Sequence, residues 1–244
     1  MATVADLSGP YASFMIGPRP GRGVCRVCFN LTDGYERCYR CAHRSMRLDA
    51  VVPISYSIAR EPLHGALVGY KRLRGSVAER LTRELAAVLW RYLAIHEQCV
   101  ARAAGVPGFA LVTTVPSGSR ERDERHPLRQ IVGELVAPTR GRYERLLARS
   151  ATIVPPHAFE PSKFEPTRAL TGQAVLLIDD TWTTGANAES AAAALRSGGA
   201  GSIGAVVIGR YLTREWHENQ RRLRAVALRF DWGRCAVEEA AGAP

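Results

Sequence analysis

Long apolar runs are missing from this sequence of 244 residues: none approaches the roughly 20 residues that a helix needs to cross a bilayer. The first ten residues, MATVADLSGP, also lack the basic stretch and the apolar stretch of a secretion signal. These two absences argue against membrane insertion and predict a cytoplasmic protein.

Lysine is almost missing as well. Lys71 and Lys163 are the only two lysines, so 31 of the 33 basic residues are arginines, and the formal net charge is +10. Together with the many alanines, this bias is explained by GC-rich coding more readily than by selection for guanidinium chemistry. An excess of positive charge favours polyphosphate or nucleic-acid partners, but it does not choose between them.

Aromatic residues make up only 7% of the chain, and no cluster in which they alternate with basic residues stands out. Such clusters are typical of proteins that stack the bases of single-stranded nucleic acids. A nucleic-acid partner therefore ranks behind a phosphorylated small molecule.

Hydrophobic residues make up 46% of the chain and charged residues 23%, which is enough to bury a full core beneath a solvated surface. Gly9-Pro10, Gly17-Pro18 and Pro20 predict an irregular leader over residues 1–22. Four clustered cysteines mark a small module over residues 23–48. A main domain over residues 49–244 remains, without internal repeats.

Apolar segments alternate with helical patterns along the main domain. Strands are expected at residues 51–57, 109–115, 174–179 and 203–208, and helices at 76–104, 123–136 and 186–196. The proline-rich stretch 137–172 is expected to form a loop or a cover over the site. This order predicts an α/β fold, a parallel sheet flanked by helices with ligands at the carboxyl ends of its strands.

The cysteine module contains Cys25-x-x-Cys28 and, after nine residues, Cys38-x-x-Cys41. This spacing can supply four thiolates to a tetrahedral Zn²⁺ ion, which would provide the folding free energy of a segment too small for its own core. Two disulfides or an iron–sulfur cluster are the alternatives, and His43 could replace one ligand. Cys99 and Cys235 stand apart and are expected to be buried structural thiols.

The strongest pattern is VLLIDDTWTTGANA at residues 175–188, an apolar strand that ends in two acids and turns into a helix. The free N–H groups of a helix N-terminus bind phosphate, and the preceding carboxylates can accept hydrogen bonds from ribose hydroxyls. An ordinary strand exit with a threonine cap is the structural alternative. The expected ligand is a phosphosugar with a divalent cation, held by Asp179, Asp180, Thr181, Trp182, Thr183, Thr184 and Gly185. Because no P-loop lysine follows, a nucleoside triphosphatase is disfavoured.

A second anion-binding loop is expected after the strand at 109–115. Small residues there leave backbone amides accessible, and arginines can pair with pyrophosphate oxygens. The candidates are Ser117, Gly118, Ser119, Arg120 and Arg125. Lys71, Arg72 and Arg74 are weaker candidates to line the same site, because such a run is also typical of a solvated turn.

The segment at 175–188 resembles the phosphoribosyl pyrophosphate motif of type I phosphoribosyltransferases. With the cysteine module, the chain resembles the ComF-type, amidophosphoribosyltransferase-like family, which has an N-terminal zinc ribbon. The resemblance implies that Asp179 and Asp180 are catalytic residues that hold the ribose, and that Thr181 to Gly185 hold the 5′-phosphate. It implies structural Zn²⁺ and a Mg²⁺ ion that accompanies the substrate. Asn187 stands where the family often has threonine, and Arg125 to Gln130 lack the family's glycine and asparagine.

The function implied by the resemblance is transfer of a phosphoribosyl group to a nitrogen acceptor with release of pyrophosphate. Two alternatives stay open: a protein of DNA uptake or single-stranded nucleic-acid binding, linked to competence, and a sensor that binds phosphoribosyl pyrophosphate without turnover. The acceptor and the oligomeric state, a homodimer included, do not follow from the residues.

Overall fold

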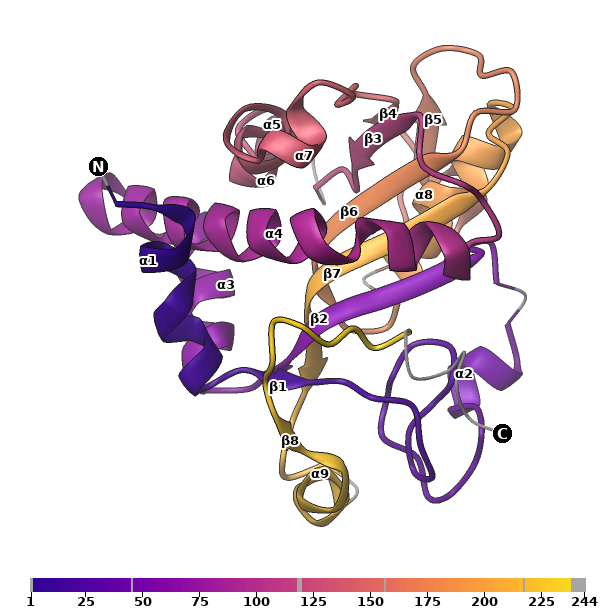
Figure 1. Cartoon of the computed structure of the whole chain (residues 1–244). Helices are drawn as coiled ribbons and strands as arrows, with labels where there is room; N and C mark the ends of the chain where they lie inside the picture. Colours follow the sequence, from indigo (N-terminus) through magenta and orange to yellow (C-terminus); the bar gives the residue numbers. More distant parts are fainter. Residues whose placement is uncertain (1, 45, 118–119, 156, 217, 238–244) are drawn as a thin grey trace.

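The computed structural model describes residues 2–44, 46–117, 120–155, 157–216 and 218–237. At its centre lies a four-stranded sheet in the order β2-β7-β6-β3, in which every neighbouring pair is parallel (Figure 1). The strands are β2 (Ala50–Ile58), β3 (Leu111–Thr114), β6 (Val175–Trp182) and β7 (Ile203–Leu212). The α/β architecture with a parallel sheet, predicted from the alternating pattern, is thereby confirmed.

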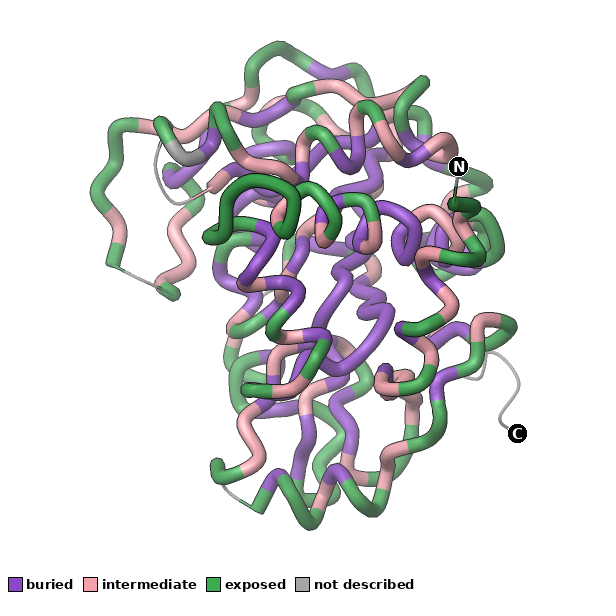
Figure 2. The backbone as a smooth tube through the Cα atoms, turned by 90° about the vertical axis from the view of Figure 1, so that its left-hand side faces the viewer, coloured by how far each residue is buried: buried purple, intermediate pink, exposed green. Residues whose placement is uncertain are grey.

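Helices cover both faces of this sheet, which is why its strands are almost continuously apolar. Leu176 and Ile178 of β6 pack toward α3 (Pro62–Arg72) and α4 (Gly75–Ala103). Val175 and Leu177 point to the other face and pack with the alanine-rich α8 (Ala186–Ser197). Figure 2 shows the resulting buried centre surrounded by an exposed periphery.

The predicted helices at 76–104 and 186–196 are confirmed as α4 and α8, but two strands are longer than predicted. β6 continues through Trp182 because it keeps pairing with β7, and β7 continues through Leu212 because its last residues pair with β2. Asp179 and Asp180 therefore lie within a strand, not after its end.

The prediction of an irregular leader is wrong for its first part. Residues 4–13 form α1 (Val4–Ser8) and the 3-10 helix η1 (Gly9–Ser13). The Thr3 side chain and Asp6 make a reciprocal capping box, and Pro10 is tolerated in the first turn of η1 because its missing N–H has no intrahelical acceptor there. β1 (Ile16–Gly17) then pairs antiparallel with β8 (Leu228–Arg229), so two segments that are far apart in the sequence lie side by side.

The segment predicted as one helix at 123–136 is helical, but it is divided before Pro127. α5 (Arg120–Glu124) stops there, and α6 (Pro127–Gln130) begins with the proline in its first turn and continues as the π-helical turn η2 (Ile131–Leu135). The ring of proline excludes the helical conformation for the preceding residue, which forces the break.

The proline-rich stretch contains short regular elements: α7 (Ala137–Arg140), β4 (Leu147–Arg149), the 3-10 turn η3 (Pro161–Lys163) and β5 (Phe164–Pro166). β4 and β5 pair antiparallel, and Glu160 N–H donates to Ser190 Oγ of α8 at 2.9 Å. The remaining helices are α2 (Tyr39–Ala42) and α9 (Asn219–Val226). Within the described part of the chain, no helix is both long and apolar enough to span a membrane.

Candidate functional site

A cleft of about 1260 Å³ opens at the carboxyl ends of the parallel strands. Ser117 after β3, Asp179 of β6 and Tyr211 of β7 reach it from three strands. α3, which follows β2, contributes Tyr70 and Lys71. In open parallel sheets ligands bind at this edge, so the cleft is the candidate ligand-binding site.

Asp180 is the most firmly held side chain of the cleft. It is buried, accepts a hydrogen bond from the Tyr70 hydroxyl and forms an ion pair with Lys71 Nζ at 2.6 Å. Burial alone would raise the pKa of Asp180, but Lys71, His126 and the hydrogen bond from Tyr70 together hold it below its usual value. This carboxylate is therefore ionised and fixed in orientation.

Asp179 behaves in the opposite way. Burial, together with the negative charge of Asp180, raises the pKa of Asp179 to about 8. At neutral pH most molecules thus hold one charged and one protonated carboxyl group, and Lys71 balances the charge.

The loop between β6 and α8 consists of only Thr183, Thr184 and Gly185. Gly185 has φ of +76°, and a Cβ atom there would overlap the Trp182 indole, which is buried beneath the loop. Trp182 therefore shapes the loop from below through its packing. Thr181 and Thr183 line the cleft, whereas Thr184 Oγ1 accepts a hydrogen bond from Ala186 N–H at 3.3 Å. The first turn of α8 thus presents its remaining N–H groups beside threonine hydroxyls.

The second predicted anion loop is arranged around Asp123. This buried carboxylate accepts a hydrogen bond from Ser117 N–H at 2.7 Å and forms ion pairs with Arg129 and Arg145. Ser117 and Arg125 line the cleft, as predicted from the sequence. Arg120 begins α5 but its side chain is not described, and Gly118 and Ser119 lie outside the described residues.

One of the two lysines of the chain lines the cleft, and the other contacts a residue that does. Lys71 binds Asp180, and the buried Lys163 donates from Nζ to Asn187 Oδ1, in the first turn of α8, at 2.6 Å. Burial lowers the pKa of Lys163, and nearby Arg149 lowers it further. Lys71, Arg72 and Arg74 all line the cleft and all are exposed, so this run is both a solvated turn and part of the wall of the cleft.

Sequence reasoning assigned no role to Tyr70 or His126. Tyr70 fixes Asp180 across 110 positions of the chain, and His126 caps α6 by accepting the Leu128 N–H at its Nδ1 atom. Burial lowers the pKa of His126 despite the nearby Asp180, so the ring is neutral at pH 7. No short-range pattern could have identified Tyr70, because only the folded sheet edge brings it to Asp180. The cap that His126 forms is a local contact within the start of α6.

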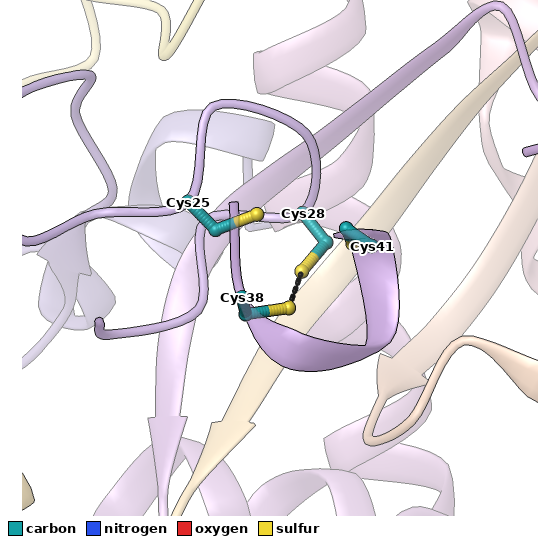
Figure 3. A group of neighbouring side chains, drawn as sticks. All are labelled: Cys25, Cys28, Cys38 and Cys41. Atoms are coloured by element: carbon teal, nitrogen blue, oxygen red, sulfur yellow. Dashed lines mark hydrogen bonds between the residues drawn. The ribbon is translucent and has the colours of Figure 1, made fainter. Parts of the chain in front are cut away.

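The four clustered cysteines come together as predicted, on the turn at 25–28 and at the start of α2 (Figure 3). All four are buried free thiols whose sulfur atoms lie within 4.8 Å of one another, and Cys28 Sγ and Cys38 Sγ are 3.7 Å apart. Two thiolates on a tetrahedral ion with bonds of about 2.3 Å are separated by about 3.8 Å. The cluster can therefore hold a metal ion with little rearrangement, and two disulfides are not formed.

Arg210 connects this cysteine centre to the loop between β6 and α8. It is buried at the carboxyl end of β7 and donates from Nε to Cys28 O at 3.0 Å. Its Nη1 atom donates to Trp182 O at 3.0 Å and to Thr183 O at 3.1 Å. One guanidinium thus fixes the backbone of both sites.

Comparison of the sequence with models of known protein families finds no match, and comparison with curated proteins finds no significant one. Function must therefore be inferred from the residues of the cleft and of the cysteine centre.

Proposed function

We propose that the chain is a type I phosphoribosyltransferase-like protein that binds phosphoribosyl pyrophosphate in this cleft and transfers its phosphoribosyl group to a nitrogen acceptor. The observation that carries the proposal is the position of an ionised, oriented Asp180 beside a threonine-rich helix N-terminus. A carboxylate that accepts from ribose hydroxyls and N–H groups that bind a phosphate match the two halves of one ligand.

The remaining groups fit the leaving pyrophosphate. Lys71, Arg72 and Arg125 line the same cleft and can neutralise its oxygens, while Ser117 supplies a hydroxyl. The carboxylate oxygens of the acidic pair are ligands of the kind that Mg²⁺ prefers, and Mg²⁺ would supply further charge neutralisation of the pyrophosphate.

In the reaction, the bond between the anomeric carbon and the pyrophosphate oxygen breaks, and a bond from the acceptor nitrogen forms. The electron pair leaves with pyrophosphate, and the nitrogen loses a proton. The transition state has oxocarbenium character, so the protein contributes mainly by positioning the sugar and stabilising charge. Asp179 and Asp180 are the residues to which we assign that role.

For the cysteine centre we propose structural Zn²⁺. Four thiolates close its coordination shell, which leaves no position for a reacting water. The resulting cluster carries a net charge of about −2, and the buried guanidinium of Arg210 beside Cys28 O offsets part of it.

The test of the proposed function is calorimetric titration of the full chain with phosphoribosyl pyrophosphate, with Mg²⁺ and with a chelator. We expect saturable binding of one ligand per chain that requires Mg²⁺, followed by pyrophosphate release when the correct amine is added. Absence of binding in the presence of Mg²⁺ would remove the proposal. Binding without pyrophosphate release across a panel of amines would favour the sensor.

The second candidate is single-stranded nucleic-acid binding, and a groove of about 620 Å³ favours it. Arg19, Arg91 and Arg229 line this groove with Trp232, and Arg91 stacks on the Trp232 ring at 4.5 Å. The run from Arg229 to Arg234 thus contains the mixture of basic and aromatic residues that seemed to be missing from the sequence. Retention of single-stranded DNA that falls with salt and is insensitive to Asp179→Asn would support this candidate; absence of retention at low salt would remove it.

Ligand affinity is expected to rise with pH, because Asp179 must lose its proton to accept a ribose hydrogen bond. The pKa of Asp179 is raised to about 8, so the binding-competent fraction falls about tenfold for each pH unit below that value and levels off above it. In Asp179→Asn the slope should disappear, and its affinity should approach that of the natural protein near about pH 6. Calorimetry at several pH values measures both curves; equal slopes would contradict the assignment.

A further inference from the structure

A second cluster of metal-ligand side chains lies between α4 and the C-terminal segment. His96 and Cys99 are one turn apart on α4, and Cys235 comes from the C-terminal segment. Their ligand atoms lie within 4.8 Å of one another, and all three residues are buried. We infer that His96, Cys99 and Cys235 form a second metal site, for a thiophilic divalent ion of the Zn²⁺ type, which fastens the C-terminal segment to α4.

The orientation of His96 supports the inference. Its Nε2 atom lies 2.8 Å from the carbonyl oxygen of Trp232, to which it donates, so Nδ1 carries the lone pair. Nδ1 in turn lies 3.8 Å from Cys99 Sγ. Metal-binding histidines commonly donate their second ring N–H to a carbonyl, which fixes the tautomer and aims the other nitrogen at the ion.

The distances fit the size of the ion. In a tetrahedral zinc site a thiolate sulfur and an imidazole nitrogen are about 3.6 Å apart, given bonds of about 2.3 Å and 2.0 Å. The separation of 3.8 Å between Nδ1 and Cys99 Sγ therefore needs only a small contraction. Tyr92 Oη, 3.2 Å from Cys235 Sγ, is an oxygen within reach of the fourth position.

Charge also favours a divalent ion here. Two thiolates and a neutral imidazole around Zn²⁺ give a neutral unit, so the complex can be buried without an uncompensated charge. Arg102 Nη2, 3.8 Å from Cys99 Sγ, is a cation that favours the thiolate form needed for metal binding. Soft thiolate ligands select zinc-like ions over Mg²⁺ or Ca²⁺.

Such a site would order the segment that carries the basic groove. Trp232 already makes two contacts. Its carbonyl oxygen accepts a hydrogen bond from His96 Nε2, and its ring stacks against the Arg91 guanidinium. Cys235, three residues further on, would add a metal-mediated link from this segment to α4.

The experiment is elemental analysis of the purified full chain after equilibration with zinc and removal of loosely bound ions. We expect two zinc ions per chain in the natural protein and one in Cys99→Ser/Cys235→Ser. In Cys28→Ser/Cys38→Ser, the loss of the other ion should leave the second site loaded. His96→Gln, which keeps both thiols, should weaken binding of the second zinc ion, so that a colorimetric chelator removes this ion faster.

The natural protein alone already decides the question, so failure of a variant to fold does not protect the inference. One zinc per chain, with Cys99 and Cys235 both titrating as free thiols or joined as a disulfide, would overturn it. With cobalt in place of zinc, the second site should add absorption of a tetrahedral ion with mixed sulfur and nitrogen ligands. An unchanged cobalt spectrum in Cys99→Ser/Cys235→Ser would contradict it.

Discussion

Replacing Asp179 and Asp180 together by asparagine is expected to weaken binding of phosphoribosyl pyrophosphate by roughly a thousandfold at about pH 8.5. Each carboxylate would lose a charge-assisted hydrogen bond from a ribose hydroxyl, worth about 1.5–3 kcal/mol. A loss of about 4 kcal/mol in total corresponds to that factor in the dissociation constant. Calorimetry measures it directly.

The same double substitution makes the cleft more positive, because Lys71 loses its partner Asp180. A site that merely attracts anions would then bind inorganic pyrophosphate equally well or more tightly. If the acidic pair recognises ribose, the double substitution weakens binding of phosphoribosyl pyrophosphate but does not weaken binding of inorganic pyrophosphate. Glu144→Gln is the matched control, because Glu144 is a half-exposed carboxylate paired with Arg168 away from the cleft. A parallel loss for both ligands would contradict the assignment of the acidic pair to ribose.

The second large effect is expected from the cysteine centre. Cys28→Ser/Cys38→Ser should lose one zinc ion and lower the midpoint of thermal unfolding by more than about 10 °C. Structural zinc sites supply about 10–16 kcal/mol in small peptides, which is comparable to the whole stability of a typical domain. Each kcal/mol shifts the midpoint of a chain of this size by about 2–4 °C. A chelator titration of Cys99→Ser/Cys235→Ser, which keeps only the first cysteine cluster, followed by a thermal melt, gives the same comparison with that cluster intact.

The contacts of Arg210 lead us to expect a second effect of Cys28→Ser/Cys38→Ser, on ligand binding. The Arg210 guanidinium donates to Cys28 O on one side and to Trp182 O and Thr183 O on the other. Loosening the cysteine loop should therefore also weaken binding of the sugar phosphate, and by linkage the bound ligand should slow the loss of zinc. Cys99→Ser/Cys235→Ser is the comparison, since it removes two equally buried thiols without touching Arg210. A midpoint within about 2 °C of the natural protein after loss of the first zinc would contradict a structural role.

The central strands and the helix after the acidic pair were predictable, because an apolar run followed by threonine and glycine has few other solutions. The length of β6 was not, since Thr181 and Trp182 stay in the strand through pairing with β7. The same holds for the leader, where Gly9 and Pro10 pointed to irregular chain while the capping residues Thr3 and Asp6 decided otherwise.

Some residues of the candidate sites could likewise be recognised from the sequence, and others could not. Asp179 and Asp180 could be recognised from their neighbours in sequence, and the four spaced cysteines likewise. Tyr70, which fixes Asp180, could not, because only the fold brings α3 against β6. The cluster of His96 and Cys99 left a faint signal in its one-turn spacing, but its third member lies on a segment whose position depends on the complete domain.

The scarcity of lysine has a chemical consequence. Lys71 contacts Asp180 and Lys163 contacts Asn187, so every side-chain amine of the chain lies beside the cleft. We expect acylation of Lys71 to weaken ligand binding in the proposed site, because it removes the positive charge beside Asp180, while the arginine side chains would stay unmodified. Reductive methylation with isotope-labelled formaldehyde would in turn place two magnetic-resonance reporters at the cleft, with no other side-chain amine in the background.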